Sequence, residues 1–81
     1  MSDYVTVNAI LHRDQRGERS IRVSPGGDDQ YGAWIGRKWI RDMGPTGSHV
    51  HGRNWLGRPV RLPQITISIP KWLAKETRLL R

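Results

Sequence analysis

Apolar and polar side chains alternate in four short stretches of this 81-residue chain, and this pattern constrains its fold more than any other feature. In residues 4–12, Val5, Val7, Ala9 and Leu11 share one face of an extended backbone. Similar stretches follow at residues 19–24, 31–35 and 60–69. A period of two is typical of a half-buried β-strand. The sequence therefore predicts four strands joined by polar, glycine-rich turns.

The last of these stretches changes phase part of the way along. Val60 and Leu62 have the opposite parity from the isoleucines of residues 65–69, and Pro63 lies at the change. Proline donates no ladder hydrogen bond, and one extra residue moves a strand's side chains to the other face. We therefore expect a bulge or a bend at residues 62–64.

The C-terminal stretch and the middle of the chain complete the predicted fold. Pro70 suits the first position of a helix, and residues 71–79 favour a short helix. Residues 37–43 allow one helical turn, and the four glycines and two prolines of residues 43–59 predict a long flexible loop. The fold class is α+β: a small antiparallel β-sheet or partly open β-barrel of about four strands with a short C-terminal helix. Residues 1–81 form a single domain.

Composition excludes several classes of protein. Cysteine is absent, so no disulfide, thiolate zinc site or thiol nucleophile is available. No apolar run approaches the roughly 20 residues of a membrane span. The first four residues contain neither a basic leader nor an apolar segment, so we expect no secretory signal. We expect a small cytoplasmic protein with no membrane partner.

The charge of the chain is basic and uneven. The formal net charge is +7, and the two halves of the chain differ. Residues 1–36 contain four basic and five acidic side chains, whereas residues 37–81 contain ten basic and two acidic ones. Such an excess over half of a small chain indicates a surface that faces a polyanion or an acidic protein.

Three of the four tryptophans lie in the basic half, each flanked by cations. Trp39 and Trp55 share the pattern Gly-Arg-x-Trp-(Ile/Leu), and Trp72 lies between two lysines. Single-stranded nucleic acid binds such sets, because bases stack on the rings and cations meet phosphates. The absence of phenylalanine instead favours the core for Trp34, Trp39 and Trp72, with Trp55 balanced between the two. The candidate partner- or nucleic-acid-binding residues are Arg37, Lys38, Arg41, Arg53, Trp55, Arg58, Lys71, Lys75 and Arg78.

Metal, cofactor and catalytic motifs are weak. His49 and His51 would lie on one side of an extended segment, but no third ligand is near them in sequence. The Gly-rich segments 26–27 and 44–48 lack the Lys-Ser/Thr of a phosphate-binding loop. No nucleophile, base and acid are recognisable from their spacing. We expect no cofactor, no metal and no enzymatic activity.

Two segments resemble a known group of proteins. Residues 21–23 with Ala33-Trp34-Ile35-Gly36-Arg37-Lys38-Trp39-Ile40, and then Ile65-Thr66-Ile67-Ser68-Ile69-Pro70-Lys71-Trp72-Leu73-Ala74-Lys75-Glu76, are similar to small uncharacterised proteins of phages and mobile elements. In those proteins a strand ends in a Trp-(Leu/Ile)-Pro-Lys-Ser-like turn, and a later strand runs into Pro-x-Trp-Leu-Ala. This chain has Gly36 where they usually have proline, and it differs from them in residues 43–59.

By analogy of class, the chain resembles phage-encoded anti-CRISPR proteins, which are short and bind a CRISPR effector complex. The resemblance implies a non-enzymatic inhibitor of a host nucleoprotein machine, for example one that blocks nucleic-acid binding by a type I CRISPR surveillance complex. The alternative is a direct nucleic-acid-binding domain that uses a basic, tryptophan-containing face. The expected partner is a host protein or nucleoprotein complex, or nucleic acid itself, and the chain is expected to be a monomer or a weak homodimer.

Overall fold

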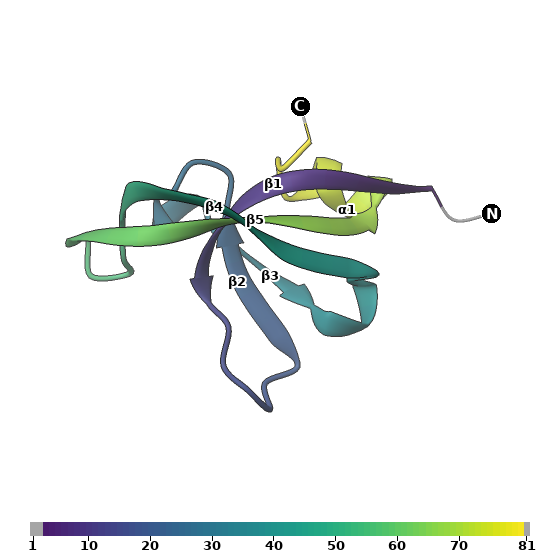
Figure 1. The fold of residues 1–81 in the computed structure, drawn as a ribbon, viewed down its shortest axis with the longest axis horizontal. Coiled ribbons are helices and arrows are strands. Elements are labelled where there is room, and N and C mark those ends of the chain that lie inside the picture. The colour runs from purple at the N-terminus through teal and green to yellow at the C-terminus, as the bar shows by residue number, and fades with distance from the viewer. Residues whose placement is uncertain (1–2, 81) are drawn as a thin grey trace.

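The computed structural model describes residues 3–80 and contains one antiparallel sheet with a short C-terminal helix (Figure 1). The five strands are arranged in the order β3-β2-β1-β5-β4, and the sheet is not closed into a barrel. The expected small antiparallel sheet with a C-terminal helix is therefore confirmed, with five strands rather than about four. The elements are β1 (Tyr4–Arg13), β2 (Ser20–Ser24), β3 (Ala33–Gly36), β4 (Asp42–Arg53), β5 (Pro59–Pro70) and α1 (Lys71–Glu76), with short 3-10 helices η1 (Asp29–Tyr31) and η2 (Arg37–Trp39).

The core lies between α1 and one face of the sheet, which we call the helix face. Val7 pairs with Ile67 and Ala9 with Ile65 across β1 and β5. These cross-strand pairs are the alternating residues of the sequence, and β-branched side chains pack well on a pleated surface. The remaining fully buried core side chains come from β2, β3, β5 and α1: Ile21, Val23, Ile35, Ile69 and Ala74.

Helix α1 is shorter than the sequence predicts, because the chain reverses direction soon after it. Pro70 is the N-cap, Lys71 is the first helical residue, and Glu76 is the last. Arg78 then adopts a left-handed conformation with φ 63°. The reversal brings Leu79 and Leu80 back against the core. These leucines are therefore placed by a C-terminal turn and not by continuation of the helix to residue 79.

Residues 42–53 form β4, so the predicted long flexible loop at residues 43–59 is wrong over most of its length. This strand pairs with β5 from Asp42–Ser68 to Arg53–Pro59. Only residues 54–58 remain as a turn between the two strands. β4 lacks an alternating apolar pattern because most of it is an exposed edge, and its register is imposed by β5.

The predicted bulge at residues 62–64 of β5 occurs instead in the neighbouring strand. β5 pairs with β1 without interruption from Pro70 to Gln64. The register shift lies in β4 between Pro45 and His49. Val60 and Leu62 consequently face away from the core side, and both are only partly exposed.

The segment after β2 covers this second apolar set. The N–H of Arg53 donates to the carbonyl of Gly27 over 2.9 Å, next to an isolated bridge between Asp28 and Arg53. A side chain at Gly52 would collide with the Gly27 carbonyl and would lie 3.0 Å from Leu62. Glycine at position 52 therefore allows residues 25–29 to dock on β4. The contact therefore joins residues 25–29 to the end of β4 on the side of the sheet opposite α1.

Within residues 3–80, no helix has the length and apolar character needed to cross a lipid bilayer.

Candidate nucleic-acid interface

All four tryptophans are at least one-third exposed to solvent. The exposed fractions are 52% for Trp34, 36% for Trp39, 78% for Trp55 and 53% for Trp72. The expectation that Trp34, Trp39 and Trp72 fill the core is therefore wrong. Small aliphatic side chains already fill the space between α1 and the sheet, and alternation along β3 places Trp34 opposite the buried Ile35.

Two of these tryptophans line one hollow on the side of the sheet opposite α1, which we call the groove face. The hollow has a volume of about 830 Å³ and is open to solvent. Its walls come from β1, β2, β3, β5 and the turn between β4 and β5, so residues distant in sequence meet there. The residues that carry its chemistry are His12, Arg13, Arg22, Trp34, Trp55 and Arg61.

Arg22 is held in place at the wall of this hollow. Its Nε donates to Oδ1 of Asp29 over 3.0 Å, and its guanidinium also donates to the Asp29 carbonyl over 2.9 Å. The guanidinium carbon lies 5.5 Å from the centre of the Trp34 ring, within the range of a cation–π contact. Asp29 therefore fixes Arg22, and Arg22 in turn orients Trp34.

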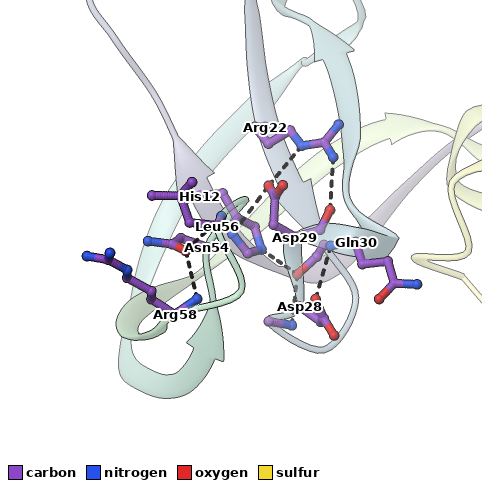
Figure 2. Close-up of polar contacts among 10 residues, drawn as sticks. His12, Arg22, Asp28, Asp29, Gln30, Asn54, Leu56 and Arg58 are labelled. Carbon is purple, nitrogen blue, oxygen red and sulfur yellow. Dashed lines mark hydrogen bonds and ion pairs between the residues drawn. The ribbon is translucent and has the colours of Figure 1, made fainter.

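His12 connects β1 to the same loop. Figure 2 shows His12, Arg22 and Asp29 side by side. Nε2 of His12 lies 2.7 Å from Oγ of Ser24, and that oxygen accepts the N–H of Gly27 over 2.8 Å. Oγ of Ser24 therefore joins the His12 ring to the backbone of residue 27. The other ring nitrogen, Nδ1, lies 3.8 Å from Oδ1 of Asp29.

Ser24, His12 and Asp29 thus lie close together in the fold, although their spacing in the sequence did not predict this. Ser24 is fully buried and does not line the hollow. The contacts that are present hold residues 24–29 in place beneath the groove. Burial lowers the pKa of His12, partly offset by the charge of Asp29; Arg22 lowers it further, and Asp28 raises it.

The turn between β4 and β5 presents Trp55 to solvent and is itself well ordered by hydrogen bonds. Oδ1 of Asn54 accepts the N–H groups of both Leu56 and Arg58 over 3.0 Å (Figure 2). Gly57 supplies the positive φ, 77°, that the turn needs. A rigid turn holds the tryptophan outward without the entropy cost of ordering a mobile loop on binding.

The cations beside Trp55 differ from those at the other end of the hollow. Arg13 pairs with Glu18 over 2.7 Å, and Arg22 pairs with Asp29. Within residues 3–80, no ion pair involves the arginines near Trp55, which are Arg53, Arg58 and Arg61. The arginines near Trp55 are therefore outside the ion pairs of the fold, and Asp28 and Asp29 line a neighbouring hollow together with Arg53 and Trp55.

The structure divides the nine predicted binding residues into three groups, and the two groups at α1 and η2 adjoin through the contact of Trp39 with Trp72. Arg53, Trp55 and Arg58 lie together at the end of the β4–β5 hairpin, and Trp55 lines the hollow. Lys71, Lys75 and Arg78 lie on and after α1, and Lys75 and Arg78 line a different hollow. The third group, near η2, consists of Arg37, Lys38 and Arg41. The roles of all nine in binding stay predictions.

Arg37 is engaged within the chain. Its guanidinium forms an ion pair with Asp14 and donates to the carbonyls of Glu18 over 2.6 Å and of Gln15 over 3.1 Å. These contacts join η2 to the turn between β1 and β2. A structural role therefore explains Arg37 without any ligand. Arg41, in the same group, has its guanidinium carbon 4.9 Å from the centre of the Tyr4 ring.

Trp39 and Trp72 contact each other edge to face, with ring centres 5.3 Å apart. The ammonium of Lys38 lies 5.3 Å from the centre of the Trp39 ring. Neighbours within the chain therefore occupy much of the Trp39 ring, whereas Trp55 has no aromatic or cation–π partner among residues 3–80. The two regions differ in how much ring surface they offer to a stacked base.

His49 and His51 are exposed on β4, one on either side of Val50. Within the described residues 3–80, no group of three His, Cys, Asp or Glu side chains is arranged to hold a metal ion.

Sequence reasoning missed Arg13, Arg22, Trp34 and Arg61 as groove residues. The first three lie in the half of the chain where acids slightly outnumber bases, so the count of charges drew attention away from them. One signal was present: alternation already placed Trp34 on the opposite face from Ile35. Trp55 follows the contact of Arg53 with Gly27 by two residues, and no local pattern predicts that contact.

Comparison with known proteins found no matching family model, no matching curated protein and no matching solved structure.

Proposed function

We propose that this chain binds single-stranded nucleic acid in the hollow of the groove face. Trp55 and Trp34 stack on bases, and the arginines without ion pairs contact phosphates: Arg53, Arg58 and Arg61. One observation carries the proposal. Two tryptophans, each more than half exposed, line the same hollow as Arg61, and the hairpin that presents Trp55 also carries Arg53 and Arg58.

The exposed tryptophan rings give up the stabilisation that burial in the core would provide. A tryptophan side chain buries roughly 150–250 Å² when it is packed in a core, and such burial stabilises a fold. A chain without phenylalanine and with only 36% hydrophobic residues has few large side chains, yet it leaves its tryptophans outside. Stacking of a base on an aromatic ring contributes roughly 1–3 kcal/mol, enough to account for a ring kept in solvent.

Single strands fit this site better than duplexes. Bases in a duplex are already stacked on one another, so their faces are not available to a protein ring. Trp55 projects from a hairpin turn over a concave surface, which suits a flexible strand with bases turned inward. Contacts between arginines and backbone phosphates carry no information about the bases. We therefore expect the affinity to depend little on base sequence.

The test is a titration of labelled single-stranded DNA, RNA and duplex DNA at two salt concentrations. We expect single strands to bind more tightly, with an affinity that falls steeply as salt rises. Trp55→Ala should weaken binding about 5- to 150-fold, the equivalent of one lost stacking contact. Arg16→Ala is the matched control, because Arg16 is exposed in the turn between β1 and β2 and lines no part of the hollow.

Absence of binding at low salt overturns the proposal, as does equal affinity of Trp55→Ala and the unaltered chain. A loss in Arg16→Ala as large as in Trp55→Ala would also overturn it, since binding would then depend on net charge and not on the groove.

A second candidate is the inhibitor of a host nucleoprotein machine that the phage-like resemblance implies. The Trp39–Trp72 pair supports it, because rigid, partly exposed tryptophans next to cations are typical anchors of protein interfaces. Its test is co-purification of the tagged chain with a type I CRISPR surveillance complex, together with protection of a sensitive phage. Loss of both in Trp72→Ala would support this function, and recovery of no host complex with no protection would overturn it.

A further inference from the structure

A second, smaller hollow of about 340 Å³ lies between the loop after β2 and the end of α1. Pro25, Tyr31 and Leu80 line it together with Lys75 and Arg78. The tyrosine is 62% exposed. Two cations and a phenol therefore border one concave surface that is separate from the groove.

Arg78 has an unusual backbone. It is the one residue other than glycine with a positive φ within residues 3–80. The N–H of Arg78 donates to the carbonyl of Lys75 over 3.1 Å, and that of Leu80 to the carbonyl of Ala74 over 3.0 Å. This turn returns the chain to the core, so the fold requires a left-handed residue at this position.

The fold does not require an arginine there. Glycine is the usual residue at the left-handed position after a helix, and asparagine is the next most common, because a Cβ is strained in that conformation. Within residues 3–80, the structure gives the Arg78 guanidinium no ion pair and no hydrogen bond. Conformational strain without an internal contact points to a function for the side chain outside the fold.

The second hollow borders the same loop as the groove. Residues 25–31 contribute Pro25 and Tyr31 to this hollow, and Asp29 to the groove. Asp29 is already paired with Arg22 on the groove side, so its charge is partly neutralised there. A strand that passes from the groove to the two cations crosses this loop, where a carboxylate oxygen of Asp28 accepts the N–H of Gln30 over 3.0 Å.

We infer that Tyr31, Lys75 and Arg78 form a phosphate-binding subsite that extends the groove, an inference that rests on the proposed binding of single strands. An arginine fork and a lysine ammonium are the usual donors to phosphate oxygens, and a tyrosine hydroxyl also donates to them. The phosphate belongs either to a backbone diester of the bound strand or to its terminal monoester. Both offer the same oxygens to the same donors.

The experiment compares two strand lengths on the unaltered chain and four variants. Single strands of about 4 and about 16 nucleotides bracket the usual site sizes of small β domains. They are titrated, with and without a terminal phosphate, into the unaltered chain, Arg78→Gly and Trp55→Ala. Arg78→Asn is a second variant, because asparagine also tolerates the left-handed conformation without the charge. Arg16→Ala controls for the loss of one positive charge.

We expect Arg78→Gly and Arg78→Asn to bind the long strand about tenfold more weakly, and the short unphosphorylated strand as the unaltered chain does. The slope of log affinity against log salt for the long strand should fall by about 0.7, the share of one phosphate contact. A terminal phosphate that strengthens short-strand binding only when Arg78 is present identifies the monoester as the source. An effect of length alone identifies the backbone diester.

Failure of the inference and failure of the proposed function give different results. If Arg78→Gly and Arg16→Ala bind the long strand equally well while Trp55→Ala weakens both lengths, the subsite is absent and the groove remains. If the unaltered chain binds neither strand, or if Trp55→Ala weakens neither, the groove itself is not the binding site and the inference falls with it.

Discussion

The two faces of the sheet use different kinds of side chain. The helix face is closed by isoleucine, valine and alanine, most of them fully buried. The groove face carries arginines, histidine and exposed tryptophan around an open hollow. In most small domains the largest apolar side chains anchor the core, whereas here they lie outside it. The difference indicates that stability and binding are assigned to opposite sides of one thin sheet, so substitutions should separate them.

The largest expected effect belongs to the helix face. Ile67 is fully buried and lies between Val7 and Met43 in the sheet. Ile67→Ala should lower the free energy of unfolding by about 3 kcal/mol, through lost burial and the cavity left behind. Chemical denaturation followed by circular dichroism measures it.

Trp55→Ala is the matched comparison on the groove face, because it removes a larger apolar side chain. We expect the free energy of unfolding to change by no more than about 0.5 kcal/mol, since Trp55 is 78% exposed. Comparable losses in Ile67→Ala and Trp55→Ala would contradict the division between the two faces.

A smaller effect is expected where the groove is fastened to the sheet. Ser24→Ala removes the oxygen that accepts the Gly27 N–H and contacts Nε2 of His12, and it leaves both buried groups without that partner. We expect a loss of about 2 kcal/mol in the free energy of unfolding, together with weaker strand binding. Ser48→Ala, at an exposed position of β4, should change neither quantity measurably. Unchanged stability in Ser24→Ala would mean that the loop does not depend on this contact.

A gain of stability is expected at Arg78. Glycine there relieves roughly 1–2 kcal/mol of steric cost, but its greater freedom in the unfolded chain offsets roughly 0.5–1 kcal/mol. Arg78→Gly should therefore raise the free energy of unfolding by about 0.5–1 kcal/mol. Lys71→Gly, in the first turn of α1 with an ordinary backbone, should lower it by up to about 1 kcal/mol. A loss of stability in Arg78→Gly would show that the arginine side chain supports the fold.

The success of sequence reasoning follows the same division between faces. Alternation predicted the helix face well, because Val5, Val7 and the isoleucines of β5 are selected by burial. β4 was missed because an exposed edge strand needs no apolar pattern, and its glycines and Pro45 are typical of loops. The bulge was placed in β5 instead of the facing segment of β4, since parity shows that two apolar sets diverge but not which strand adapts.

The groove was harder to predict because it depends on long-range contacts. Trp34 and Trp55 are 21 positions apart in the chain, yet they line one hollow, and residues 25–29 dock on the end of β4 beside it. The count of charges selected Arg53 and Arg58 as binding residues, and this stays a prediction, although neither forms an ion pair within residues 3–80. The same count also selected Arg37, which contacts Asp14 within the chain. Composition records how many charges exist, and only the fold decides which of them are neutralised.

The smallest expected effect is a dependence of stability on pH through His12. Burial lowers the pKa of its imidazole, the carboxylate of Asp29 opposes that change, Arg22 adds to it, and Asp28 opposes it. Opposing causes keep the net effect modest. The folded state binds this proton less readily than the unfolded state does. Above the unfolded pKa near 6.5, His12 is neutral in both states and does not reduce the free energy of unfolding. Stability should then fall as pH decreases through 6.5 toward the lower folded value, and level off below it.

Protonation also changes the contacts of His12 in a way that reaches the groove. A proton on Nε2 would have to point at Oγ of Ser24, which could no longer donate its own proton to that nitrogen. The prediction is checked by denaturation between about pH 5 and pH 8 for the unaltered chain, His12→Gln and the control His51→Gln, whose side chain is exposed on β4. His12→Gln should flatten the decline on the acid side, and His51→Gln should retain it. A decline that survives in His12→Gln would assign the proton to another group and would separate the buried histidine from the pH response of the groove face.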